Sequence, residues 1–140
     1  MSTQATATST RATAKFELKG WDEQTLEEVE GGKKLTRASV KNTWSGNVEG
    51  DGTLEYLMAY RDDGTADFVG LHRVVGRVEG RSGSFVLRDS GTYGGGAARG
   101  NLTVVPGAGT GELSGLRGEG SYISKQGEHH ADITLEYHFE

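Results

Sequence analysis

The 140-residue sequence predicts an all-β fold, a single small closed antiparallel β-barrel of eight strands. Glycine occurs 23 times against one proline, and only 34% of the residues are hydrophobic, a profile that suits short strands and tight turns rather than helices. Apolar and polar residues alternate along residues 132–139, as they do in a strand with one buried face. Eight such segments, with no long helical pattern among them, favour a sheet that closes on itself, because closure removes exposed edges.

The predicted strands follow one another with short connections. Gly20 predicts a bulge in the first strand, which shifts Trp21 and Glu23 to the other alternation. Residues 1–13, rich in Ser and Thr, are expected to form a disordered N-terminal tail, so the barrel domain covers residues 14–140. In chain order the strands are expected at residues 14–21, 34–49, 53–62, 65–79, 82–90, 101–106, 112–123 and 132–139.

Two predicted turns set the pairing of the three central strands. Residues 63–64, Asp-Gly, are typical of a type I′ hairpin turn, which places Glu55 opposite His72. A two-residue turn at 80–81 places His72 opposite Asp89. Because side chains alternate between the two faces of a strand, these three residues, the polar trio, are expected side by side on one face of the sheet.

Two arginines indicate which face is outside. Arg73 is expected opposite Arg88, and like charges that face each other are tolerated only where water screens them. That face is therefore the outer one, and a predicted turn at residues 51–52 leads to the same assignment. Besides the polar trio, the inner face is expected to carry Leu57, Ala59, Phe68, Gly70, Val74, Phe85 and Leu87.

The outer face of the central strands is then expected to be unusually apolar, with Tyr56, Met58, Tyr60, Val69, Leu71, Val75 and Val86 on it. This is more contiguous apolar surface than a monomer usually exposes. We therefore expect a homo-oligomer formed through the surface around Tyr56, Met58, Tyr60 and Leu71, most often a two-fold dimer. The alternative is an inverted barrel, in which these tyrosines line the lumen and the two arginines point inward.

The polar trio predicts acid–base chemistry inside the barrel. One carboxylate orients the histidine while the other moves a proton on a substrate, so Glu55, His72 and Asp89 are the candidate catalytic residues. The alternative is a buried structural network in which His72 neutralises its neighbours. One histidine with two carboxylates is a set of low specificity for metals, and no metal or other cofactor is expected.

An eight-stranded barrel is about wide enough to hold one small ligand. The candidate ligand-binding residues are Trp21, Glu23, Trp44, Leu57, Phe68, Phe85 and Tyr137. Such a pocket suits the cofactor-independent isomerisation or cyclisation of an apolar small molecule. Two non-catalytic alternatives stay open: a carrier or sensor that uses the same cavity, and a filled barrel that serves as an assembly module.

Charge and composition exclude several other classes. The net charge is −5 with no basic run, which argues against nucleic acid and anionic membranes as partners. The chain has no cysteine, so it offers neither a disulfide nor a thiolate site. It also shows no apolar stretch of membrane-spanning length and no secretory signal, so a soluble cytoplasmic protein is expected.

Two long segments and one short motif carry a family resemblance. The segments are EYLMAYRDDGTADFVGLHRVVGRVEGRSGSFVLRDSGTY and VVPGAGTGELSGLRGEG, and the motif is WDE at residues 21–23. Together they resemble the domain-of-unknown-function (DUF) 3224 family of bacterial proteins over nearly everything after the N-terminal tail. The resemblance implies a small eight-stranded antiparallel barrel similar to the allene oxide cyclases, and it brings no established activity or catalytic residues.

Overall fold

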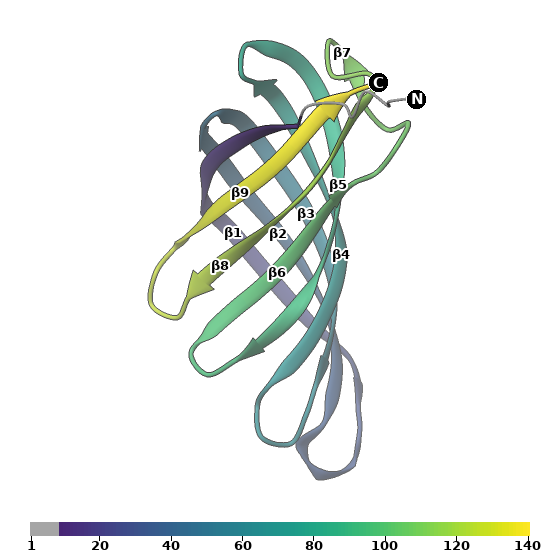
Figure 1. Cartoon of the computed structure of the whole chain (residues 1–140). Helices are drawn as coiled ribbons and strands as arrows, with labels where there is room; N and C mark the ends of the chain where they lie inside the picture. The colour runs from purple at the N-terminus through teal and green to yellow at the C-terminus, as the bar shows by residue number, and fades with distance from the viewer. Residues whose placement is uncertain (1–8) are drawn as a thin grey trace, which may run out of the picture.

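The protein closes one antiparallel β-sheet into a barrel, as Figure 1 shows for the computed structural model, which describes residues 9–140. Around the barrel the strands run β4-β3-β2-β1-β9-β8-β6-β5, and pairing of β4 with β5 completes the ring. The short β7 is an additional strand beside β5. The elements are β1 (Thr10–Glu28), the 3₁₀ turn η1 (Glu30–Gly32), β2 (Lys34–Gly46), β3 (Val48–Tyr60), β4 (Ala66–Val78), β5 (Arg81–Gly94), β6 (Ala97–Val104), β7 (Thr110–Gly111), β8 (Leu116–Lys125) and β9 (His130–Phe139).

The predicted all-β, closed eight-stranded antiparallel barrel is therefore confirmed. Most of the expected N-terminal tail lies outside the described residues. Strand β1 begins at Thr10, which pairs with Tyr137 of β9, so residues 10–13 are part of the sheet.

Strand β1 is the longest and changes its register partway along. Residues 10–17 pair with β9, pairing with β2 begins at Ala14, and the second half of the strand continues along β2 alone. A register shift between Leu18 and Gly20 is the predicted bulge. The shift brings Leu18 and Trp21, three positions apart, onto the same inner side, where both line one pocket.

Strand β3 lies one residue out of the predicted register, which corrects the sequence analysis. The chain turns through Arg61–Thr65, where Asp63 Oδ1 accepts a hydrogen bond from the Thr65 amide, instead of in two residues. Leu54 therefore pairs with His72, and Glu55 with Leu71. A one-residue slip turns every side chain of a strand to the other face.

The prediction of the turn between β2 and β3, at residues 51–52, was also wrong. The chain reverses at Asn47, so that Trp44 pairs with Gly50, and not at residues 51–52. The inner residues of β2, such as Val40 and Trp44, are buried as predicted. The pairing of β4 with β5 differs from the prediction by two residues, which preserves the faces and leaves Arg73 and Arg88 outside.

The outer apolar surface therefore has different members from those expected. Tyr56 and Met58 are buried inside the barrel and Tyr60 lines its pocket, so these three do not belong to the outer surface, whereas Leu71 is exposed as predicted. The expected homo-oligomer stays a prediction, and its surface is now centred on Leu57, Val69, Leu71 and Val75, all exposed on β3 and β4.

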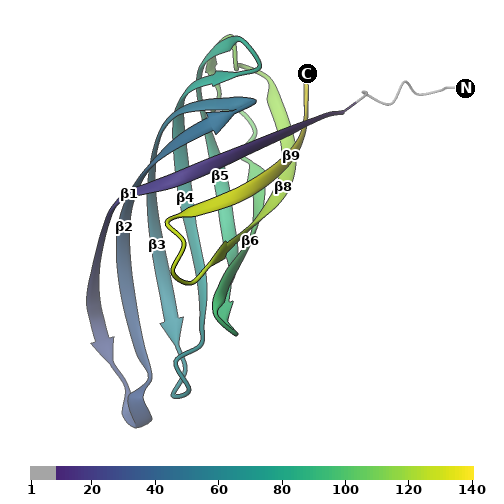
Figure 2. The same cartoon turned by 90° about the vertical axis from the view of Figure 1, so that its left-hand side faces the viewer.

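The two ends of the barrel differ. The C-terminus and β7 lie at one end, and the hairpins β3–β4, β5–β6 and β8–β9 lie at the other, with the β1–β2 hairpin extending furthest (Figures 1 and 2). At the first end, the segment between β6 and β8 buries Leu113 completely. We call these the closed end and the hairpin end.

Candidate functional site

A pocket opens at the hairpin end of the barrel and has a volume of about 450 Å³. Aromatic side chains from five strands make up much of its wall, with Leu18, Val40, Leu54, Met58 and Ala98 between them. The mouth is polar, because Ser124, Lys125, Gln126 and Glu128 of the β8–β9 hairpin border it. The aromatic members are Phe16, Trp21, Tyr56, Tyr60, Phe68, Tyr93 and Tyr122.

Glu23 organises one side of the mouth. Its carboxylate accepts hydrogen bonds from Trp21 Nε1 (3.1 Å), Thr36 Oγ1 (2.7 Å) and the Tyr60 hydroxyl (2.7 Å). Burial opposes ionisation of this carboxyl, but the three hydrogen bonds outweigh it and lower the pKa of Glu23. Glu23 is therefore a charged group that positions two aromatic rings of the pocket, Trp21 and Tyr60.

Two tyrosines and a carboxyl group form the floor of the pocket. The Tyr56 hydroxyl donates to Asp89 Oδ2 (2.8 Å), and the Tyr122 hydroxyl donates to Asp89 Oδ1 (3.0 Å). The two hydroxyl oxygens are themselves 2.7 Å apart. Both rings line the pocket, and Asp89 lies beneath them with no exposed surface.

The buried position of Asp89 changes its acidity. Burial raises the pKa of Asp89 to about 6, although the hydrogen bonds from Tyr56 and Tyr122 act in the opposite direction. Burial also raises the pKa of both tyrosines well above its ordinary value. Among residues 9–140 no ion pair includes Asp89, so no neighbouring cation offsets its burial.

His72 lies deeper and in a separate polar cluster. Its Nε2 atom is 3.2 Å from Asn42 Oδ1 and 3.3 Å from Trp44 Nε1, and Trp44 Nε1 donates to Asn42 Oδ1 at 3.1 Å. Burial lowers the pKa of His72 to about 4, so the imidazole is neutral at physiological pH. Within the described residues, His72 Nδ1 and Asn42 Nδ2 have no hydrogen-bond partner.

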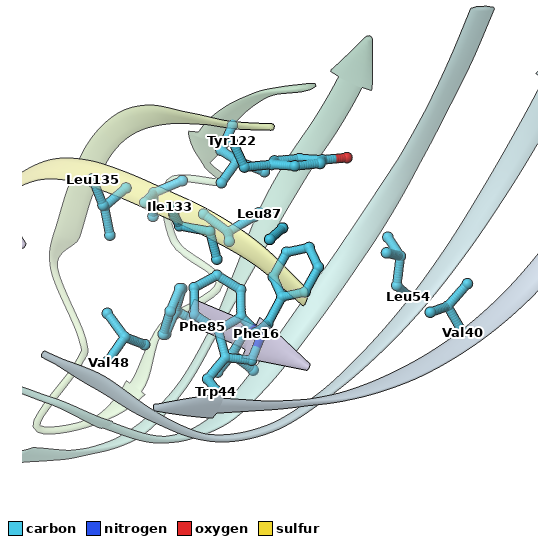
Figure 3. Close-up of a cluster of buried hydrophobic side chains, with 14 of the residues drawn as sticks. Phe16, Val40, Trp44, Val48, Leu54, Phe85, Leu87, Tyr122, Ile133 and Leu135 are labelled. Atoms are coloured by element: carbon cyan, nitrogen blue, oxygen red, sulfur yellow. The ribbon is translucent and has the colours of Figure 1, made fainter. Parts of the chain in front are cut away.

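Phe16 separates this cluster from the pocket floor. Its ring centroid is 5.5 Å from that of Tyr122 on one side and 5.4 Å from that of Trp44 on the other. Figure 3 shows Phe16 among the buried side chains, with the Tyr122 hydroxyl directed away from Leu135. His72 does not line the pocket.

The structure places the three residues of the polar trio in three different surroundings. His72 and Asp89 are both fully buried, as expected, but they belong to two different clusters. The expectation that Glu55 lies in the lumen is wrong, because the register of β3 turns it outward. There it bonds Arg37 Nε and Ser39 Oγ, both at 2.9 Å, and these bonds lower the pKa of Glu55.

Only some of the candidate ligand-binding residues lie at the pocket. Trp21 and Phe68 line the pocket, and Glu23 supports its mouth. Trp44 and Phe85 are buried but do not line the pocket. Two residues lie elsewhere: Leu57 is on the outer surface, and Tyr137 bonds Glu79 at the closed end.

Sequence reasoning missed Tyr56 and Tyr122 as functional residues. Tyr56 was expected outside because of the assumed two-residue turn. Asp63, two positions before Thr65, is a signal for a longer loop, since an aspartate side chain often bonds the amide two residues on. With that loop, alternation alone places Tyr56 in the lumen.

Two features are absent from the described residues. No three His, Asp or Glu side chains in residues 9–140 are grouped as a metal site. No helix in the same part of the chain is long and apolar enough to cross a membrane.

Comparison with known proteins identifies relatives of the chain. A family model described as "Protein of unknown function (DUF3224)" matches residues 12–137. The crystal structure of a protein with unknown function from the DUF3224 family of Shewanella oneidensis MR-1 is similar, with 32% sequence identity and a TM-score of 0.75. That match covers 94% of this chain and 98% of the other. No curated protein matches the chain.

Proposed function

The chain belongs to the DUF3224 family of proteins of unknown function, and we propose that it binds an apolar small molecule in the pocket at the hairpin end of its barrel. The observation that carries the proposal is the pocket itself. Its volume of about 450 Å³ falls within the range of small-molecule sites, roughly 300–1,000 Å³. Predominantly apolar walls, rich in aromatic side chains and with a small number of polar groups, are typical of such sites.

The distribution of polar atoms in the pocket defines how a ligand lies. The walls offer ring faces and aliphatic groups, whereas the floor offers the hydroxyls of Tyr56 and Tyr122. A ligand with a flat apolar body and one polar group at its inner end satisfies both. The alternative of a filled barrel is less well supported, because it requires a lumen without a cavity of this size.

A second candidate function is the isomerisation or cyclisation of that ligand without a cofactor. It is favoured by Asp89, a buried carboxyl group that reaches the pocket through two tyrosine hydroxyls. A group with a pKa near the operating pH is suited to proton transfer, and burial raises the pKa of Asp89 to about 6. The likeness to allene oxide cyclases stays a prediction, as does a carrier or sensor that binds without turnover.

The binding proposal is tested by filling the pocket. Ala98 lines it, so Ala98→Trp places an indole in the space that the ligand would occupy. A matched control is Ala59→Trp, which adds the same ring to the exposed face of β3. Titration with the fluorescent apolar probe N-phenyl-1-naphthylamine should show at least tenfold weaker binding for Ala98→Trp and unchanged binding for Ala59→Trp. Equal binding by both variants, or none by the unaltered protein, would contradict the proposal.

A further inference from the structure

Four oxygen atoms at the pocket floor, the two phenol oxygens and the two carboxyl oxygens of Asp89, are joined by hydrogen-bond contacts. The Tyr56 hydroxyl is 2.8 Å from Asp89 Oδ2 and 2.7 Å from the Tyr122 hydroxyl, and the Tyr122 hydroxyl is 3.0 Å from Asp89 Oδ1 and 3.1 Å from Asp89 Oδ2. At such distances each pair of oxygens needs a hydrogen between them, because two facing lone pairs repel. The Tyr122 hydroxyl lies almost equally far from both carboxyl oxygens, so one hydrogen serves both of these contacts. The three pairs of residues, Tyr56 with Asp89, Tyr56 with Tyr122 and Tyr122 with Asp89, therefore need three hydrogens.

The two phenols supply two of these hydrogens, since burial holds both tyrosines in the neutral form. An ionised Asp89 supplies none, so one contact would bring two unprotonated oxygens together. A carboxylic acid at Asp89 supplies the third hydrogen. It donates to Tyr56, Tyr56 donates to Tyr122, and Tyr122 donates to the other carboxyl oxygen, which completes a ring.

We propose that Asp89 is a neutral carboxylic acid in the ligand-free protein at neutral pH, and that the pocket takes ligands with an acceptor oxygen, such as a ketone or a phenolate. The second part rests on the proposed binding function. A ligand oxygen at the floor receives a hydrogen from one tyrosine, while the Asp89 proton satisfies the oxygen of that tyrosine. A neutral Asp89 also places no negative charge against the electron-rich ligand atom, as in other sites where an apolar setting keeps a carboxyl group protonated.

The groups around Asp89 agree with this assignment. Apart from the two tyrosines on β3 and β8, its neighbours across the sheet are Gly70 on β4 and Leu102 on β6, and neither titrates. The next inward residue of β4, His72, is neutral and makes its hydrogen-bond contacts with Asn42 and Trp44. The charged residues at the pocket mouth, Glu23, Lys125 and Glu128, make no ion pair with Asp89 among the described residues.

The positions of these hydrogens also affect the pKa of Asp89. Burial raises the pKa of Asp89 to about 6 when both tyrosines donate to the carboxyl group. A tyrosine hydrogen that lies in the Tyr56–Tyr122 contact is no longer donated to Asp89, and its loss moves the pKa further upward.

The protonation state is measured without any ligand. Carbon-13 NMR of protein labelled at the aspartate carboxyl carbons follows the titration, and Asp89→Asn identifies the signal. We expect the Asp89 carboxyl to be protonated still at pH 7, whereas an unperturbed aspartate titrates at about 3.9. An Asp89 signal that is already that of the carboxylate at pH 7 overturns the proton assignment, whatever the pocket binds.

The ligand class is measured with two compounds of the same ring and similar size, the ketone acetophenone and the oxygen-free ethylbenzene. We expect acetophenone to bind at least tenfold more tightly, and this advantage to disappear in the Tyr56→Phe/Tyr122→Phe variant while N-phenyl-1-naphthylamine still binds. The comparison in the unaltered protein is decisive even if that variant does not fold. Equal affinity for both compounds overturns the ligand class and leaves the binding function intact. If no probe binds, including N-phenyl-1-naphthylamine, the binding function and the ligand class both fail.

Discussion

The hydroxyl oxygens of Tyr56 and Tyr122 lie 2.7 Å apart, although the two residues are separated by 66 positions in the sequence. Tyr56 belongs to β3 and Tyr122 to β8, which lie four strands apart in either direction around the ring. The two side chains therefore reach from opposite walls and meet across the lumen. They close the pocket from below and hold Asp89 under its floor.

This contact should contribute measurably to stability. Tyr122→Phe removes one hydroxyl and leaves Asp89 and Tyr56 with one partner fewer in a buried setting, which costs about 1–3 kcal/mol in the free energy of unfolding. Urea denaturation measures the difference. The control is Tyr93→Phe at the pocket mouth, which should change stability by less than about 0.5 kcal/mol. A Tyr122→Phe protein as stable as the control would show that the contact adds nothing.

The acidity of Asp89 predicts a dependence of stability on pH. Its pKa is raised from 3.8 to about 6 in the folded state, so between these values the folded protein binds more protons than the unfolded chain. The contribution of Asp89 is therefore largest below about pH 4 and has fallen by about 3 kcal/mol at pH 6, at 1.36 kcal/mol per unit. The proton that the proposal above assigns to Asp89 at neutral pH extends this fall to higher pH. Asp89→Asn removes this slope. Urea denaturation of both proteins at several pH values measures the free energy of unfolding against pH. Parallel curves for the two proteins would contradict the predicted contribution of Asp89.

His72 predicts the opposite slope in almost the same range. Its pKa is lowered from 6.5 to about 4, so the unfolded chain binds the extra proton in this window. The contribution of His72 is full above about pH 6.5 and is lost as pH falls towards 4, again by about 3 kcal/mol. His72→Gln should thus resist acid better, relative to its own stability at pH 7, than the unaltered protein. In the unaltered protein the opposite slopes of Asp89 and His72 largely cancel between about pH 4 and 6. A His72→Gln protein that loses as much stability in acid as the unaltered protein would contradict the predicted contribution of His72.

The sequence was sufficient for the architecture but not for the site, for a physical reason. Strand number, alternation and the closed sheet follow from local patterns, and so does the inward direction of His72 and Asp89. Which side chains of β3 point inward depends on the lengths of the two loops that flank the strand. An error of one residue in a loop length places Glu55 in the lumen instead of Tyr56. The partnership of Tyr56 with Tyr122 joins opposite walls, so no pairing of neighbouring strands could reveal it.

The corrected register also redirects the prediction of self-association. Leu71 is 57% exposed and lies beside Glu55, which pairs with Arg37, so charges of both signs border the apolar surface on β3 and β4. Such a border lets an identical copy approach without net repulsion. We expect a dimer in sedimentation velocity that Leu71→Lys disrupts and that Ile123→Lys, at an exposed apolar position on β8, preserves. A monomeric unaltered protein, or a dimer that survives Leu71→Lys, would exclude this interface.

Gly52 packs directly against the buried cluster of Asn42, Trp44 and His72 and leaves no room for a larger side chain. A Cβ atom there would come within 2.5 Å of His72 Nε2 and 3.0 Å of Trp44 Nε1, and closer still to Asn42 Oδ1. Gly52→Ala therefore forces this cluster apart, and overpacking of this kind costs about 1–3 kcal/mol. At Gly20 the nearest atom to an added Cβ, Lys41 Cβ, is 3.9 Å away, so Gly20→Ala should leave stability within about 0.5 kcal/mol. Thermal and urea denaturation of the two variants distinguishes these outcomes, and equal stability would mean that the cluster has room that the structure does not contain.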